Sequence, residues 1–204
     1  MNFEIVTLAE HHLPDLVALQ KLCFPDPFPE DQLWSTAHLC GHMQRFPEGQ
    51  FVVTSNGVAV ASCTNILISE QSYAAHASWN ETVGGLFLER HDPRGTTLYG
   101  VDISVHPRYR QLGIGRQLYA QRFEYVTNGR LNRYATACRL PGFRASGLPD
   151  PNTYSEAIIS GRISDPTLTP LLKYGLTFVT TIDNYMVDIE SGNAAALLIW
   201  EPDQ

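Results

Sequence analysis

Apolar residues along this chain fall into two patterns, alternation in short runs and recurrence at the spacing of one helix face. Residues 2–8 alternate and are rich in β-forming residues, whereas residues 9–24 repeat leucines at near-helical spacing. Two β-rich runs flank Asn56-Gly57, a strong hairpin signal, so an antiparallel pair is expected over 51–68. In chain order the pattern predicts a strand (2–8), two helices (9–24, 31–46), the hairpin (51–68), a strand (97–105), a helix (114–127), a strand (133–140), two short helices (153–163, 167–175) and two closing strands (176–189, 194–200).

This order of elements is typical of a mixed α/β fold in which antiparallel and parallel strand pairs share one sheet. Two stretches, 69–96 and 141–152, show weak periodicity and carry glycine and proline turn signals, so we expect them to be irregular. Long irregular stretches inside a compact domain are usually functional or mobile. We therefore expect the first of them to contribute to a binding site.

The composition favours one cytoplasmic domain. A chain of 204 residues with 44% hydrophobic content can build one sizeable core, so a single domain over 1–204 is expected. The net charge of -7 and the pI of about 5.4 argue against nucleic-acid binding and favour cationic or neutral small partners. The chain start resembles no signal sequence, and no run of apolar residues is long enough to cross a membrane, so no membrane association is expected.

Cysteine and histidine spacing gives no sign of a disulfide frame or a metal centre. The four cysteines lie far apart without a C-x-x-C pair, and we expect them to be reduced thiols. His38 and His42, with Cys40 between them, have a spacing that can ligate a metal on a helix. Without a further ligand nearby, an amphipathic or exposed helix is the better interpretation, and no metal is expected.

The stretch 106–121, HPRYRQLGIGRQLYAQ, follows a predicted strand and leads into a predicted helix. Gly113 and Gly115 let the main chain approach an anion, and the free N–H groups at a helix start favour negative charge. A dinucleotide fingerprint would need a glycine or alanine at Leu118, and a Walker loop would need Gly-Lys-Ser/Thr. Neither motif is present. We therefore expect the loop to bind a phosphate group of another class of ligand.

The strand end ISVHPRY together with Arg110-x-x-Gly113-x-Gly115 resembles the GNAT superfamily of acetyl-CoA-dependent N-acetyltransferases. The closer match is to a subgroup in which TLYGVDISVHPRYR, RLPGF and AAALLIW recur, in a domain that is sometimes fused to a carbon–nitrogen hydrolase. The resemblance implies a mixed, splayed central β-sheet flanked by helices, with acetyl-CoA (coenzyme A) as cosubstrate. It also implies coenzyme-binding residues, on the strand for the pantetheine arm and in the loop for the pyrophosphate: Ile103, Ser104, Val105, Arg110, Gln111, Leu112, Gly113, Ile114, Gly115 and Arg116.

The implied reaction needs a base that takes a proton from the amine. Where the family often has a glutamate, this chain has Tyr99. Asp102 lies one strand position off the Tyr99 face of a regular strand, because side chains alternate. It is a candidate base, with a structural strand aspartate as the other interpretation, and Glu81 and His106 are the alternatives.

The reaction also needs an acid that protonates the leaving thiolate. The family's tyrosine maps to Leu171, whereas the tyrosine here is Tyr174, immediately before Gly175. Positions three apart share a helix face in part, so Tyr174 is the candidate acid, and a packing role is the alternative.

The sequence therefore predicts an acyltransferase that moves an acetyl group from acetyl-CoA to a primary amine by direct attack, because the motif places no cysteine as a nucleophile. The alternative is a catalytically weak acyl-CoA-binding sensor or partner-recruiting module, since both catalytic positions depart from the family. A homodimer is a further arrangement that we expect the chain to be able to form. We expect a small-molecule or peptide amine as acceptor, entering between the 69–96 and 141–163 loops. An aromatic and acidic surface would hold it: Trp79, Glu81, His91 and Asp92.

Overall fold

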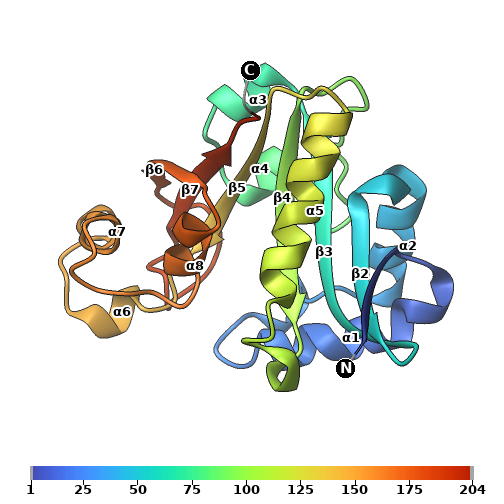
Figure 1. Cartoon of the computed structure of the whole chain (residues 1–204). Coiled ribbons are helices and arrows are strands. Elements are labelled where there is room, and N and C mark those ends of the chain that lie inside the picture. Colours follow the sequence, from blue (N-terminus) through green and yellow to red (C-terminus); the bar gives the residue numbers. More distant parts are fainter. Residues whose placement is uncertain (1, 203–204) are drawn as a thin grey trace.

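The structure is a computed structural model that describes residues 2–202. A seven-stranded sheet forms its centre, with the strand order β1-β2-β3-β4-β5-β7-β6 (Figure 1). β4 and β5 run parallel, and every other neighbouring pair is antiparallel. The strands are β1 (Phe3–Thr7), β2 (Gln50–Ser55), β3 (Val58–Ile68), β4 (Thr97–Val105), β5 (Arg133–Arg139), β6 (Thr177–Ile182) and β7 (Ala195–Trp200).

Helices cover both faces of the sheet. The longest, α5, lies in front in Figure 1 and packs on β3, β4 and β5, whereas α1 lies on the opposite face against β3 and β4. We call these two sides the α5 face and the α1 face. The helices are α1 (Leu13–Cys23), α2 (Thr36–Arg45), α3 (Glu70–Ala74), α4 (Trp79–Val83), α5 (Ile114–Asn128), α6 (Phe143–Ser146), α7 (Pro151–Ile159) and α8 (Leu168–Lys173).

Buried side chains form separate clusters on the two faces. On the α5 face, Leu98 and Tyr134 pack with Tyr119 of α5. Their sequence neighbours Tyr99 and Ala135 belong to a cluster on the α1 face. Successive side chains of a strand point to opposite sides, so each strand in the middle of the sheet supplies both layers.

The predictions of a mixed α/β fold and of the hairpin are confirmed. β2 and β3 pair antiparallel. Asn56 and Gly57 between them have φ values of 52° and 80°, and such positive values are what the preferred two-residue hairpin turn requires.

Some predicted element limits are wrong. The stretch 69–96 contains α3 and α4, because Ser69 and Ser78 act as N-caps, each accepting a hydrogen bond from a main-chain N–H of the first helical turn. The stretch 141–152 contains the short helix α6. The strand predicted over 176–189 ends at Ile182, where the chain turns with Asn184 at a φ of 51°.

Candidate active site

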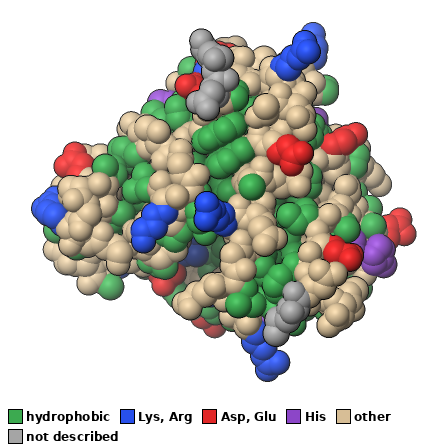
Figure 2. All heavy atoms as spheres, in the orientation of Figure 1, with side chains coloured by type: hydrophobic (Ala, Val, Ile, Leu, Met, Phe, Trp, Pro, Cys, Tyr) green, Lys and Arg blue, Asp and Glu red, His purple; other side chains and the backbone are tan. Residues whose placement is uncertain are grey.

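β4 and β5 separate halfway along β4. They pair from Thr97 opposite Arg133 to Gly100 opposite Thr136, and among residues 2–202 no strand pairs with the rest of β4 on that side. Gly100 is required here because a Cβ at this position would collide with the hydroxyl of Tyr134. Figure 2 shows the molecular surface hollowed in this region, between the part that carries β5–β7 and the part that carries α5. We call this place the divergence.

A β-bulge lies in β4 at the divergence. The register with β3 shifts between Thr64 and Asn65, so Val101 is an extra residue of β4. The bulge interrupts the alternation, and Asp102 contacts α1 on the same face as Tyr99. The expectation that Asp102 lies off the Tyr99 face is wrong, because it assumed a regular strand.

Asp102 has a half-buried carboxylate with two side-chain donors. Its Oδ2 accepts hydrogen bonds from Ser104 Oγ at 3.1 Å and from Gln20 Nε2 of α1 at 3.4 Å. Burial raises the pKa of the carboxyl from 3.8 to about 6. A carboxyl with that pKa is ionised at neutral pH and is a better base than an exposed aspartate, which suits general-base catalysis.

The main chain of the last β4 residues faces the divergence. His106 N–H donates to Val60 O of β3 at 2.9 Å. Because antiparallel pairs alternate between bonded and non-bonded, the N–H and C=O groups of Ile103 and Val105 point away from β3. Ser104 has the opposite orientation, so its main chain faces β3. An extended ligand beside β4 can therefore pair with Ile103 and Val105 as an added strand does.

The glycine loop connects the end of β4 to α5. Gln111 and Gly113 have positive φ values of 64° and 82°, which turn the chain sharply. A Cβ at Gly113 would meet nothing within 4 Å, and one at Gly115 would meet only the Tyr174 hydroxyl, at 3.6 Å. Open space beside main-chain N–H groups at the start of a long helix is what a phosphate group needs.

The residues predicted for coenzyme binding thus lie together at one end of β4, but they are not equivalent. Ile114 is 1% exposed and anchors α5 in the core, and Ser104, also 1% exposed, accepts a hydrogen bond from Gln20 of α1. The exposed loop residues that can contact a ligand with their side chains are Arg110, Gln111, Leu112 and Arg116. Arg110 Nε already donates to Val105 O, at 3.1 Å.

Tyr174 directly follows α8 and reaches the glycine loop. Its ring is half-buried, with the ring centroid 5.5 Å from that of Tyr119. Its hydroxyl lies beside Gly115. Leu171, where the family has its tyrosine, is 5% exposed and packs in the core. Tyr174 therefore brings a tyrosine to the start of α5 from the C-cap of α8, three residues after Leu171.

Glu81 and His106, the other candidate bases, serve local structure. Glu81 Oε2 accepts hydrogen bonds from Ser78 Oγ at 2.6 Å and from Ser78 N–H at 3.2 Å, in a capping box of α4. His106 Nδ1 accepts a hydrogen bond from Arg108 N–H at 3.1 Å. Of the three candidates, Asp102 is the one at the bulge.

The residues predicted to hold the acceptor also have structural partners. The main-chain N–H of Trp79 donates to Tyr185 O at 2.8 Å, and the Trp79 side chain packs on the core of the α1 face. His91 stacks on Phe46, with ring centroids 4.6 Å apart. Asp92 Oδ1 accepts a hydrogen bond from the main-chain N–H of Arg94 at 2.9 Å. These contacts account for the side chains without an acceptor.

Sequence reasoning missed the segment that follows α1, which contacts the end of β5. Phe24 and Phe28 lie against the Arg139 guanidinium, whose Cζ is 6.0 and 5.0 Å from their ring centroids. Arg139 makes a two-bond ion pair with Asp188, at 2.7 and 2.8 Å, and a third bond to Glu190 at 3.0 Å. The signal was the run FPDPFP, in which aromatic residues alternate with turn residues and which we interpreted only as a helix break.

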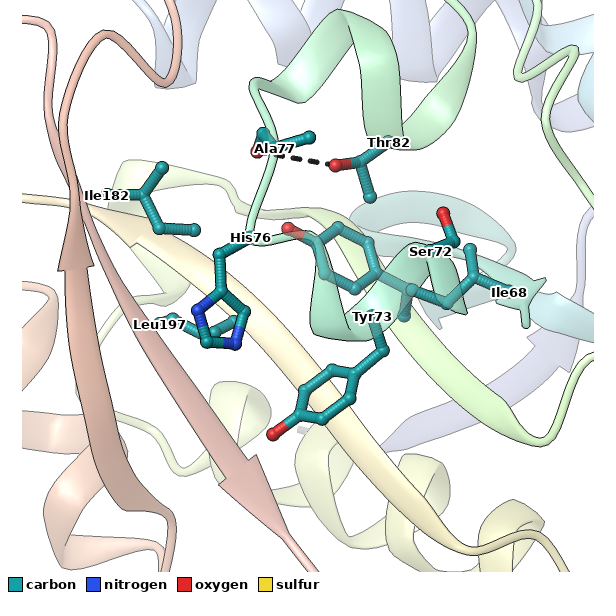
Figure 3. Close-up of a pocket in the computed structure, with 9 residues that line it drawn as sticks. Ile68, Ser72, Tyr73, His76, Ala77, Thr82, Ile182 and Leu197 are labelled. Carbon is teal, nitrogen blue, oxygen red and sulfur yellow. Dashed lines mark hydrogen bonds between the residues drawn. The ribbon is translucent and has the colours of Figure 1, made fainter. Parts of the chain in front are cut away.

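A small separate hollow lies beneath α3, lined in part by Tyr73, His76 and Tyr99 (Figure 3). It encloses about 210 Å³ including its mouth. At its edge Thr82 Oγ1 donates to Ala77 O at 3.4 Å. Neither Asp102 nor the glycine loop lines it, so it is distinct from the divergence.

Within residues 2–202 the structure holds no group of three or more histidine, cysteine, aspartate or glutamate side chains placed to bind a metal ion. Over the same residues, no helix combines the length and the apolar character that crossing a membrane would need.

Known sequences define the family. The Acetyltransferase (GNAT) family matches residues 13–148. YkwB of Bacillus subtilis (strain 168), an uncharacterized N-acetyltransferase, is 34% identical over 204 residues, which cover 98% of this chain and 90% of YkwB. YhcX of the same organism, a probable hydrolase, is 30% identical over 96% of this chain, a match that spans 38% of YhcX. The chain belongs to the GNAT acetyltransferase family and is an acyltransferase, which confirms the family predicted from the sequence.

Solved structures confirm the fold class. The loading GNATL domain of CurA from Lyngbya majuscula has a TM-score of 0.85 at 16% identity, with 98% of both chains covered. The GphF GNAT-like decarboxylase in complex with isobutyryl-CoA has a TM-score of 0.76 at 25% identity, over 97% of this chain and 98% of GphF. The ribosomal-protein-S18-alanine N-acetyltransferase of Escherichia coli has a TM-score of 0.58 at 17% identity, over 98% of this chain and 94% of that protein.

Proposed function

We propose that this protein transfers an acetyl group from acetyl-CoA to a primary amine by direct attack. The observation that carries the proposal is the divergence of β4 and β5, where no strand pairs with the main chain on one side of β4 among residues 2–202, with the open glycine loop at its end. The GphF structure supports an acyl-CoA ligand, because that relative is described in complex with isobutyryl-CoA.

The residues at the divergence fit coenzyme A. In the proposal, the main-chain N–H groups of the loop around Gly113 and Gly115 hold the pyrophosphate, and exposed Arg116 adds positive charge in an otherwise acidic chain. Ile103 and Val105 pair with the extended pantetheine arm through their main chain. Acetyl-CoA supplies the acetyl group as a thioester.

Asp102 is the proposed base and Tyr174 the proposed acid. The amine nitrogen bonds to the acyl carbon, and the carbon–sulfur bond breaks. Asp102 takes the proton that the amine loses, and the Tyr174 hydroxyl gives a proton to the leaving sulfur. Main-chain N–H groups of β4 that face the divergence stabilise the negative charge on the acyl oxygen.

Direct attack is supported by the state of the cysteine that contacts the divergence. Cys23 Sγ donates to Val105 O at 3.4 Å. Burial raises the pKa of the Cys23 thiol, so it remains protonated at neutral pH. A protonated, half-buried thiol is a poor nucleophile, and this disfavours an acyl-cysteine route.

The acceptor is a small-molecule or peptide amine that approaches from the α1 face, because the Asp102 carboxylate lies there. Phe24 and Phe28 from the segment after α1 and the exposed carboxylate of Glu190 border this side. In the proposal these rings contact the cationic amine beside the Arg139 guanidinium, which already lies against them and pairs with Glu190.

The test combines ligand binding with turnover. At a hundredfold excess over its dissociation constant, coenzyme A is expected to stabilise the fold by about 2.7 kcal/mol, a rise of roughly 5 to 10 °C in melting temperature. NAD and ATP should do clearly less, and equal stabilisation by all three contradicts the assignment. Release of free thiol from acetyl-CoA is then measured with amines, polyamines, amino acids and peptide N-termini. Binding without turnover on any of them supports the sensor function instead.

A second candidate, decarboxylation of an acyl-CoA that carries a free carboxylate on its α-carbon, is favoured by one observation. The TM-score to the GphF decarboxylase is 0.76, against 0.58 for the Escherichia coli N-acetyltransferase, at similar coverage. In this reaction the bond from the α-carbon to the carboxylate breaks, CO₂ leaves, and the α-carbon takes a proton. Loss of CO₂ from malonyl-CoA without any amine would identify it.

A further inference from the structure

Arg122 of α5 is a buried charge without a carboxylate partner. Its side chain is 1% exposed, and among residues 2–202 it forms no salt bridge. Buried charges are costly unless they are paired and fully hydrogen-bonded. The contacts that satisfy Arg122 therefore show what it is there to hold.

All its hydrogen bonds go to the place where β3 and β4 lose register. Nη2 donates to Asp102 O at 2.6 Å and to Thr64 O at 3.4 Å, and Nε donates to Asn65 Oδ1 at 2.7 Å. Thr64 and Asn65 flank the register shift in β3, and Asp102 follows the extra residue in β4. The rigid fork of one guanidinium thus bridges both strands at the bulge.

Two tyrosine rings fix the guanidinium and connect it to Gly100. Arg122 Cζ lies 5.0 Å from the ring centroid of Tyr119 and 5.3 Å from that of Tyr134. The Tyr134 hydroxyl occupies the space that a side chain at Gly100 would need. Arg122 and its neighbour Tyr134 therefore contact the residues on both sides of Val101, since Arg122 binds Asp102 and Tyr134 lies against Gly100.

We propose that Arg122 is a positioning residue that holds the β4 bulge in the form that directs Asp102 to the α1 face and the main chain of Ile103 and Val105 into the divergence. Its influence on rate rests on the proposed function. Its influence on the bulge does not.

The kinetic test compares Arg122→Met with Val126→Ala, which removes buried atoms from the same α5 face one turn away. Arg122→Met should lower kcat by about 100-fold, because small misplacements of reacting groups have effects of that size. Its KM for acetyl-CoA should rise by much less than kcat falls, because Arg122 makes no hydrogen bond to the glycine loop that holds the pyrophosphate in the proposal. Val126→Ala should lower the melting temperature with kcat nearly unchanged. Arg122→Lys, which keeps the charge but not the fork, should recover part of kcat.

Hydrogen exchange measures the bulge without any turnover. Amides of residues 101–105 should exchange faster in Arg122→Met than in Val126→Ala when the two are compared at equal global stability. If Arg122→Met does not fold, Arg122→Lys takes its place with smaller changes of the same direction. Unchanged exchange at 101–105, or a kcat loss that Val126→Ala reproduces at equal stability, overturns the proposal. An inactive wild-type protein with the expected exchange pattern would reject the proposed function and keep the positioning role.

Discussion

The proposed coenzyme side and the proposed acceptor side of the divergence are built in different ways. The coenzyme side consists of one continuous segment, 103–116, that presents mainly main-chain groups and open space. The acceptor side is assembled from the segment after α1, the end of β5 and the stretch between β6 and β7, through side chains such as Phe28, Arg139 and Glu190.

This difference decides what each side can tolerate. Ligand binding through the main chain depends on the backbone φ angles, on the strand register and on the absence of Cβ atoms. Substitutions should therefore weaken it at only a few positions. Arg139 lies far in the chain from its partners Phe28, Asp188 and Glu190 and contacts them through side chains. We expect substitutions among them to leave the glycine loop undisturbed. Substitutions on the two sides should therefore affect different kinetic constants.

The largest effect is expected from Asp102→Asn, which removes the proposed base. We expect kcat to fall by about 100- to 10,000-fold, the usual contribution of general acid–base catalysis. Affinity for acetyl-CoA should change little. In the wild type, kcat/KM should rise as the pH increases through about 6, where the Asp102 carboxyl loses its proton. A pH profile with the same rise in Asp102→Asn would exclude Asp102 as the base.

The Asp102 carboxyl also predicts how the stability of the fold changes with pH. Because burial raises the pKa of Asp102 from 3.8 to about 6, its stabilising contribution is complete below about pH 4 and is lost as the pH rises through 6. Asp102→Asn should lack this decrease. Melting temperatures of both proteins from pH 4 to pH 7 measure the difference.

On the coenzyme side, Gly113→Asp should lower coenzyme A affinity by about 10- to 100-fold, because a contact with a charged group is worth about 1.5–3 kcal/mol and the new carboxylate repels the phosphates. Gly113→Asn is the matched control, since it fills the same space at the same positive φ without the charge. Calorimetric titration measures both. Equal affinity in wild type and Gly113→Asp would place the phosphates elsewhere.

The sequence predicts the features that depend on neighbouring residues and misses those that depend on distant parts of the chain. The glycine loop and the hairpin at Asn56-Gly57 are local, since their residues adopt positive φ in response to their immediate neighbours, and the sequence located both. The bulge at Val101 is not local, because it depends on the register with Thr64 and Asn65 of β3. For this reason the face of Asp102 was predicted wrongly.

The proposed acceptor side could not be read from the sequence for a related reason. Phe28 and Arg139 lie far apart in the sequence, and their contact follows from the order in which the strands join the sheet. The acceptor residues predicted from the sequence are Trp79, Glu81, His91 and Asp92, and that prediction stays untested. Trp79 and Glu81 also serve the packing and the capping of α4.

A smaller effect is expected on the acceptor side from Phe28→Ala. Loss of an aromatic contact to a cation should raise the KM for the amine by about two- to fivefold, since an exposed contact of this kind is worth about 0.5–1 kcal/mol. Coenzyme A affinity should be unchanged. Leu22→Ala, at an exposed apolar residue of α1, is the control. If coenzyme A affinity falls as much as amine affinity, the two sides are not separate.

The smallest effect is expected from Glu81→Gln, and it decides between two interpretations of the 69–96 stretch. If Glu81 binds the amine or acts as the base, the substitution raises the acceptor KM or lowers kcat. The geometry favours the other outcome, because the Glu81 carboxylate accepts two hydrogen bonds from Ser78 at the start of α4. These bonds lower the pKa of Glu81, so the ionised form is the one that caps the helix. We therefore expect unchanged kinetics and a slightly lower melting temperature. Ser78→Ala, which removes the other half of the capping box, should give the same small loss of stability, whereas an acceptor site at Glu81 would separate the two variants.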